Sequence, residues 1–219
     1  MIILAHRGDH SNHPENSIAA FRAALDMGAD GIETDVRIDA MGEPMLFHNR
    51  WTPDARPVAS VPREELSRTV GYPVPSLLEA LDTFQGRFWN LEIKTPDALD
   101  PALQILLTRS RPNRFLITSF WHNVIERAAA GPEVETGVLV SHRPLAGGME
   151  AFLKEIRQLS IGSIVCDYET IDPVTVQSAR RMGLRVYVHG VNTSAEFDHC
   201  GRLAVYGVIT DHPDRLRQP

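Results

Sequence analysis

Features that mark a specialised environment are scarce in this sequence of 219 residues. It has only two cysteines, Cys166 and Cys200, and neither belongs to a CxxC motif or a His/Cys cluster. This pattern favours two reduced thiols over a disulfide or a zinc site. No apolar run approaches the roughly 20 residues that a membrane-spanning helix needs, so we expect no transmembrane segment.

Positive charge is also scarce. The formal net charge is −6 and the Lys and Arg residues are scattered, so the sequence has no basic patch for nucleic acid. The first residues, MIILAHRG, lack the basic start, long apolar stretch and small-residue cleavage site of a signal peptide. We therefore read them as a first strand and expect a cytoplasmic protein.

Short aliphatic runs alternate along the chain with amphipathic stretches of helical length. The runs that predict strands are residues 2–6, 31–37, 88–94, 114–119, 136–141, 163–167, 185–189 and 207–210. The stretches that predict helices are residues 17–27, 76–84, 99–109, 121–130, 150–159, 172–182, 194–200 and 213–217. Eight such pairs favour a parallel sheet closed into a (β/α)8 TIM barrel over residues 1–219 as one domain. A doubly wound open sheet is the alternative.

Helix boundaries carry recognisable residues. Asn16 and Ser76 are expected at N-caps, and the Asp172-Pro173 dipeptide opens the sixth predicted helix. Gly28 and Gly183 are expected to end the first and the sixth.

One segment interrupts the alternation. The turn signal at 39–42 and the strand-like run at 44–48 predict a β-hairpin after the second strand, which returns His48 towards that strand. Residues 49–75 follow as a short insertion with little periodicity, long enough to be a lid or a small subdomain, with a compact linker as the alternative.

Carboxylates gather at the ends of two predicted strands. Glu33 and Asp35 share one face of the second strand, and Glu92 and Lys94 share one face of the third. Taken singly, these residues could be ordinary solvated charges. At one mouth of a barrel, however, three carboxylates would repel one another unless a cation lay between them. All-oxygen ligation favours one divalent ion, Mg²⁺ or Ca²⁺ with Mn²⁺ also compatible, held by Glu33, Asp35 and Glu92.

Two histidines belong to the same region. His6 ends the first strand and His48 ends the hairpin, so they can supply a base and an acid near neutral pH. A structural, hydrogen-bonded role is the alternative for each. Arg7 and Lys94 would then hold a phosphate.

Other histidines are less informative. His10 and His13 lie in the loop after the first strand, where we expect surface or rim positions. His189 lies at a predicted strand end and is a candidate lining residue of the pocket.

The motifs occur in an order that resembles the glycerophosphodiester phosphodiesterase family. They are HRG at 6–8, PENS at 14–17, AF at 20–21, ExDV at 33–36, His48, LEIK at 91–94, SF at 119–120 and TDxP at 210–213. The resemblance spans nearly the whole chain and implies a TIM barrel with an insertion after the second strand. It also implies that Glu33, Asp35 and Glu92 bind metal, that His6 and His48 are the acid–base pair, and that Arg7 and Lys94 contact phosphate. The implied reaction is hydrolysis of a glycerophosphodiester to sn-glycerol 3-phosphate and an alcohol, through a cyclic phosphate.

The sequence departs from the family pattern in three places. Asn49 stands where the family usually has Asp after the second histidine. The insertion is shorter than usual and lacks an Arg-Thr-Thr-like stretch, and residues 189–192 read HGVN where the family usually has Trp before Thr-Val-Asn. None of these departures touches the predicted metal ligands.

Two rival functions remain open. One is a lyase-like or lysophospholipid-directed phosphodiesterase of the same fold. The other is a non-catalytic barrel that binds an anionic ligand, against which the complete set of site residues argues.

Overall fold

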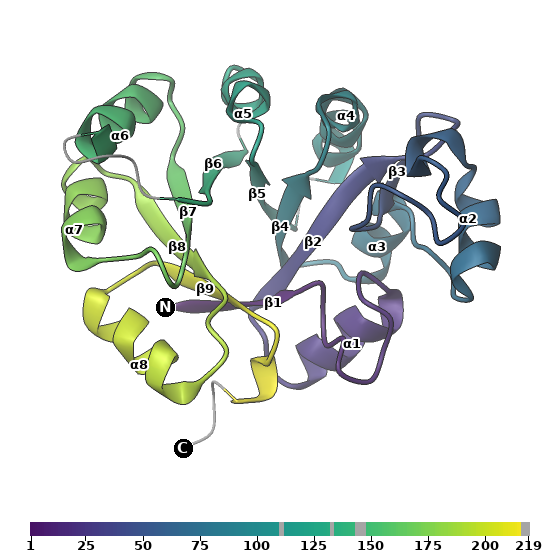
Figure 1. The fold of residues 1–219 in the computed structure, drawn as a ribbon, viewed down its shortest axis with the longest axis horizontal. Helices are drawn as coiled ribbons and strands as arrows, with labels where there is room; N and C mark the ends of the chain where they lie inside the picture. Colours follow the sequence, from purple (N-terminus) through teal and green to yellow (C-terminus); the bar gives the residue numbers. More distant parts are fainter. Residues whose placement is uncertain (110–111, 132–133, 143–147, 216–219) are drawn as a thin grey trace.

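A computed structural model describes residues 1–109, 112–131, 134–142 and 148–215. Its strands are β1 (Ile2–His6), β2 (Gly31–Ile38), β3 (Pro44–Leu46), β4 (Phe88–Ile93), β5 (Arg114–Ser119), β6 (Glu135–Val140), β7 (Ser163–Asp167), β8 (Arg185–His189) and β9 (Gly207–Thr210). Its α-helices are α1 (Ile18–Asp26), α2 (Arg63–Val70), α3 (Leu77–Thr83), α4 (Leu99–Arg109), α5 (His122–Ala129), α6 (Gly148–Gln158), α7 (Pro173–Arg181) and α8 (Ser194–Leu203). Figure 1 shows the helices arranged around the strands.

The sheet closes on itself. All neighbouring strands pair in parallel except β3, and the order β1-β9-β8-β7-β6-β5-β4-β2 is completed by pairing between β1 and β2. The closing register places His6 beside Glu33, and β2 and β4 place Asp35 beside Glu92. The predicted (β/α)8 barrel is confirmed, and closure rules out the doubly wound alternative.

Alternation along the strands divides the barrel into an interior and an outer core. Below the mouth, the interior is filled by one apolar cluster, made of Leu4, Phe88, Leu116, Leu139, Val165, Tyr187 and Ile209. The opposite faces of the strands, including Ile32, Val36, Leu91 and Ile93, belong to the core shared with the helices, as the sequence predicts. Two residues beyond Leu4 and Phe88 along the same interior face come His6 and Asn90. The apolar cluster therefore forms the floor of the barrel interior, and the polar residues lie above it at the carboxyl mouth.

The hairpin and the residues after it build a small separate core. Met45, Phe47 and Leu66 are buried together in it, with Val58, Val61 and Val74. The prediction of a connection with little periodicity is wrong over Arg63–Val70, which forms α2 beside β3 and α3 (Figure 1). The helix is entered from Pro62 without a side-chain cap, and Leu66 is its buried residue. The helix lacks an apolar stripe and a polar N-cap, so its sequence signals are only the acidic first turn at Glu64 and Glu65 and the left-handed Gly71 at its end.

Two further predictions need correction. Ser17, not Asn16, caps α1 by accepting a hydrogen bond from the backbone N–H of Ala20. The predicted helix at 213–217 is a single 3-10 turn over Pro213–Arg215, and residues 216–217 lie outside the described residues. The caps at Ser76 and Asp172 are confirmed.

Three further predictions concern the cysteines, membrane-spanning helices and the number of domains. Cys166 and Cys200 are both free, as the sequence predicts, and both are buried. Within the described residues, no helix is long and apolar enough to cross a membrane. That residues 1–219 form a single domain stays a prediction.

Candidate active site

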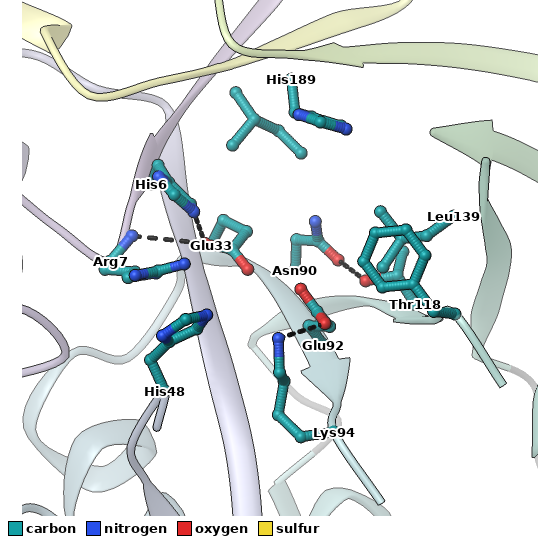
Figure 2. Close-up of a pocket in the computed structure, with 12 residues that line it drawn as sticks. His6, Arg7, Glu33, His48, Asn90, Glu92, Lys94, Thr118, Leu139 and His189 are labelled. Carbon is teal, nitrogen blue, oxygen red and sulfur yellow. Dashed lines mark hydrogen bonds and ion pairs between the residues drawn. The ribbon is translucent and has the colours of Figure 1, made fainter. Parts of the chain in front are cut away.

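A cavity of about 230 Å³ opens at the carboxyl mouth of the barrel. Six of the seven predicted site residues line it: His6, Arg7, Glu33, His48, Glu92 and Lys94 (Figure 2). The seventh, Asp35, is fully buried next to Glu92 in the register of β2 and β4. The structure therefore brings together all the residues that the sequence predicts.

A sharp turn after β1 places Arg7 in this cavity. Arg7 has a φ of 56° and Gly8 a φ of 81°, two consecutive residues in the left-handed region. A Cβ atom at Gly8 would lie 2.6 Å from the backbone of Ala20, so only glycine lets the turn pack against α1. The backbone N–H of Arg7 donates to the carbonyl of Glu33 at 2.9 Å. A non-glycine residue held at positive φ is typical of a functional site.

The three carboxylates converge. Glu33, Asp35 and Glu92 each offer a carboxylate oxygen, and these oxygens all lie within 4.8 Å of one another. Oδ1 of Asp35 is buried and accepts no hydrogen bond from the described residues, although Lys94 Nζ lies 3.2 Å away as an ion pair. A buried carboxylate oxygen with unused lone pairs is what a metal ligand offers.

Two cations border the cluster without neutralising it. Lys94 Nζ lies 2.6 Å from Glu92 Oε1, and Arg7 pairs with Asp35 at 3.1 Å and with Glu15 at 2.8 Å. These ion pairs involve Glu15, Asp35 and Glu92, so Glu33 has neither Arg7 nor Lys94 as an ion-pair partner.

The pKa values of Glu33 and Asp35 shift in opposite directions. Burial, followed by the charges of Asp35 and Glu92, raises the pKa of Glu33 to about 8, although His6 opposes the rise. Burial would also raise the pKa of Asp35, but Lys94 and Arg7 hold it below its ordinary value. The carboxylate that lacks a strong cationic partner is the one that a divalent ion would relieve. The donor set therefore fits a hard, oxygen-preferring divalent cation.

His6 is oriented by a residue that sequence reasoning missed. Its Nδ1 lies 2.6 Å from Asp211 Oδ1, and its Nε2 faces Glu33 Oε2 at 3.8 Å. Burial alone would lower the pKa of His6, but the hydrogen bond to Asp211 and the charge of Glu33 raise it above its ordinary value. Asp211 follows β9, some 205 residues from His6, so no spacing reveals the pair. The only sequence feature that pointed to Asp211 was its place in the TDxP motif at 210–213.

His48 reaches the cavity through the hairpin. The backbone N–H of Phe47 donates to the carbonyl of Asp35 at 3.1 Å, and the guanidinium of Arg37 donates twice to the carbonyl of His48. Burial lowers the pKa of His48 below its ordinary value, despite the nearby charge of Asp35. The Oδ1 atom of Asn49 lies 3.3 Å from His48 Nδ1.

Asn16 hydrogen-bonds to the carboxylate of Asp35, a role that the prediction of a helix cap did not include. It is buried with a φ of 57°, and its Nδ2 donates to Asp35 Oδ2 at 2.8 Å. Its Oδ1 accepts from the hydroxyl of Thr34 at 2.6 Å. Asn16 therefore fixes the carboxylate of Asp35, and its place in the PENS motif was the available signal.

Of the other histidines, His189 lies in the cavity, as the sequence predicts, and His10 and His13 lie in the loop after β1. His189 lines the cavity, and its Nδ1 lies 3.5 Å from Asp167. His10 is half-buried, and its Nε2 lies 3.0 Å from Asp211 Oδ1. His13 is half-buried in the same loop.

Comparison with known proteins adds a separate line of evidence. Residues 6–215 match the model of the Glycerophosphoryl diester phosphodiesterase family. The chain is 27% identical to the glycerophosphodiester phosphodiesterase of Caldanaerobacter subterraneus subsp. tengcongensis, over 98% of this chain and 96% of that protein. It is 30% identical to the glycerophosphodiester phosphodiesterase of Bacillus altitudinis, over 97% of this chain and 95% of that protein.

Solved structures support the fold. The glycerophosphodiester phosphodiesterase of Thermotoga maritima has a TM-score of 0.87 and 24% identity, covering 98% of this chain and 96% of that chain. An Oleispira antarctica phosphodiesterase, solved with the product sn-glycerol-3-phosphate, has a TM-score of 0.87 and 22% identity, covering 99% and 95%. Because the family model covers nearly the whole chain, this protein belongs to the glycerophosphoryl diester phosphodiesterase family and is a phosphodiesterase by class.

Proposed function

We propose that this protein hydrolyses glycerophosphodiesters to sn-glycerol 3-phosphate and an alcohol, with one divalent cation and with His6 and His48 as the acid–base pair. The observation that carries the proposal is one cavity lined by two histidines, two cations and two carboxylates, with a third carboxylate, Asp35, buried directly behind it. The product bound to the Oleispira antarctica neighbour supports the assignment of substrate class.

Glu33, Asp35 and Glu92 would hold the cation. When bound, the cation supplies positive charge that stabilises the phosphoryl oxygens as negative charge develops on them. Mg²⁺ or Ca²⁺ is proposed, with Mn²⁺ as a substitute, because all three donors are carboxylate oxygens. Arg7 and Lys94 complete the anion site, since both present charged donors to the same cavity.

The two histidines would move the protons. One imidazole takes the proton from the glycerol 2-hydroxyl, whose oxygen attacks phosphorus, and the other gives a proton to the departing alkoxide. The product of this step is a cyclic phosphate, which water opens with the two proton transfers reversed. Asp211 is the positioning residue for His6, because it binds Nδ1 and leaves Nε2 directed at Glu33 and the cavity.

The test is product analysis on glycerophosphocholine. A coupled assay for sn-glycerol 3-phosphate, read beside ³¹P NMR, follows both the final product and the cyclic phosphate. The proposal expects sn-glycerol 3-phosphate and choline in equal amounts, with the cyclic phosphate transient. The double variant His6→Ala with His48→Ala should form neither, and His13→Ala is the matched control. A cyclic phosphate that accumulates and persists would favour the lyase-like alternative, and no turnover of any glycerophosphodiester would refute the assignment.

A further inference from the structure

A second cluster of metal-ligating side chains lies beside the carboxylates. His6, His10 and Asp211 each offer one ligand atom, and these three atoms all lie within 4.8 Å of one another. Asp211 Oδ1 is shared, at 2.6 Å from His6 and 3.0 Å from His10. The two imidazole rings are 6.2 Å apart at an interplanar angle of 80°, so their nitrogens approach the carboxylate from different directions.

The donors differ in kind from those of the carboxylate site. Two imidazole nitrogens and one carboxylate oxygen suit zinc and similar transition metals, whereas Mg²⁺ and Ca²⁺ prefer oxygen alone. A tetrahedral zinc ion with bonds of about 2.0–2.1 Å needs donor atoms roughly 3.3 Å apart. The two contacts to Asp211 need to open by less than an ångström to reach that spacing. Each of the three side chains is about one-third exposed, which leaves access for an ion and a water molecule.

Asn192 hydrogen-bonds to Asp211, so the carboxylate is held in place by a residue other than His10. Nδ2 of Asn192 donates to Asp211 Oδ2 at 3.3 Å, and the backbone N–H of Asp211 donates to Asn192 Oδ1 at 2.9 Å. Both contacts leave Oδ1 free for the imidazoles. Outer hydrogen bonds of this kind orient the carboxylate in metal sites. His10 therefore adds a third donor that the positioning of His6 does not require.

We propose that His6, His10 and Asp211 form a second cation site, selective for zinc-like transition metals and inhibitory when filled. An ion on Nδ1 of His6 replaces the hydrogen-bonded proton there and leaves the ring proton on Nε2. With Nε2 protonated, His6 has no lone pair to accept a proton from substrate, and it releases this proton less readily than an imidazolium does. The inhibition rests on the proposed role of His6, whereas binding of the ion does not.

Binding is measured first, on the intact protein with saturating Mg²⁺ so that the carboxylate site is filled. Titration with Co²⁺ should produce the intense visible absorption of a four-coordinate ion. Titration with Zn²⁺ should then abolish this absorption by displacing one Co²⁺ ion per chain. His10→Ala removes one of the three ligands and should weaken this binding by at least about tenfold, which corresponds to about 1.4 kcal/mol. His13→Ala, in the same loop but outside the cluster, should bind as the unmodified protein does.

Turnover is measured next in the same buffers. His10→Ala should keep the basal rate, because His10 has no part in the proposed reaction, and Zn²⁺ should inhibit it at least about tenfold less effectively than it inhibits the unmodified protein. Equal Zn²⁺ binding and equal inhibition in both proteins would overturn the proposal, because the ion would then act at the carboxylates. Absence of the Co²⁺ absorption in the unmodified protein would overturn it as well. Failure of the proposed function is a separate result, since it would abolish turnover without Zn²⁺ and leave the binding titration unaffected.

Discussion

The hydrogen bonds of Asn16 predict a measurable link between a buried amide and metal affinity. Asn16→Gly removes the bond from Nδ2 to Asp35 and leaves the hydroxyl of Thr34 without its acceptor. Glycine tolerates the φ of 57° at this position, so the substitution isolates the side chain from the backbone. Asn16→Ala removes the same contacts and adds strain, because alanine is disfavoured in the left-handed region.

The magnitudes follow from the two shorter contacts, since the third, from the backbone N–H of Asp35 to Asn16 Oδ1, is long at 3.4 Å. A hydrogen bond to a charged group contributes about 1.5–3 kcal/mol, and a buried hydroxyl left unpaired costs about 1–3 kcal/mol. Since the contacts share one side chain and need not add, we expect Asn16→Gly to lower the free energy of unfolding by about 3 kcal/mol. Asn16→Ala should lose about 1–2 kcal/mol more. Metal affinity should fall about 10–100-fold in both variants, the usual effect of removing a hydrogen bond that orients a ligand.

Two assays separate these effects. Urea unfolding gives the free energy, and the Mg²⁺ concentration for half-maximal turnover gives the apparent metal affinity. Thr34→Val is the matched control, because it removes the contact to Asn16 while keeping the bond from Asn16 to Asp35. It should lower stability modestly and leave the Mg²⁺ requirement nearly unchanged. If Asn16→Gly is destabilised but needs no more Mg²⁺ than the unmodified protein, the bond to Asp35 has no role in metal binding.

Three further predictions concern protons and thiols. His6→Ala and His48→Ala should each lower kcat by at least about 10²-fold in steady-state assays, and near-normal kcat would make that histidine structural. Asn49→Asp adds a negative charge next to the ring, which stabilises the imidazolium and raises the pKa of His48. The limb of the pH–rate profile that reports His48 should therefore move to higher pH, and an unchanged profile would show that Asn49 does not act on the imidazole. Burial raises the pKa of Cys166 to about 12 and that of Cys200 to about 11, so neither thiol should react with a disulfide reagent at pH 8 until the protein is unfolded in urea.

The sequence predicts the barrel well because short aliphatic runs alternate along it with amphipathic stretches of helical length, and successive side chains of a strand alternate between its two faces. The interior floor at Leu4 and Phe88 and the polar mouth at Glu33 and Glu92 follow from that alternation together with chain direction. The hairpin is predictable for a similar reason, since its turn is local. Helix α2 is not predictable in this way, because it buries only Leu66, which packs against residues of both the hairpin and the insertion.

Direct site residues are predictable, and their supporting residues are not. His6, Glu33 and Glu92 lie at strand ends, where a barrel builds its site. Asp211 and Asn16 act on these residues through contacts that closure of the barrel and the turn after β1 create. Local propensity even misdirects the prediction for Asn16, since asparagine before a helix is a common cap. Only the folded chain shows that its amide is directed at Asp35.

The most direct test of the account is the metal requirement of turnover. Protein stripped with EDTA and dialysed should fail to release sn-glycerol 3-phosphate from glycerophosphocholine, and Mg²⁺, Mn²⁺ or Ca²⁺ should restore release to differing degrees. Equilibrium binding of Mn²⁺ should give one ion per chain at the carboxylates. Glu92→Gln should weaken both that binding and the recovery, because it removes one of the three converging charges. Undiminished turnover in excess EDTA would contradict the central claim that Glu33, Asp35 and Glu92 act through a bound cation.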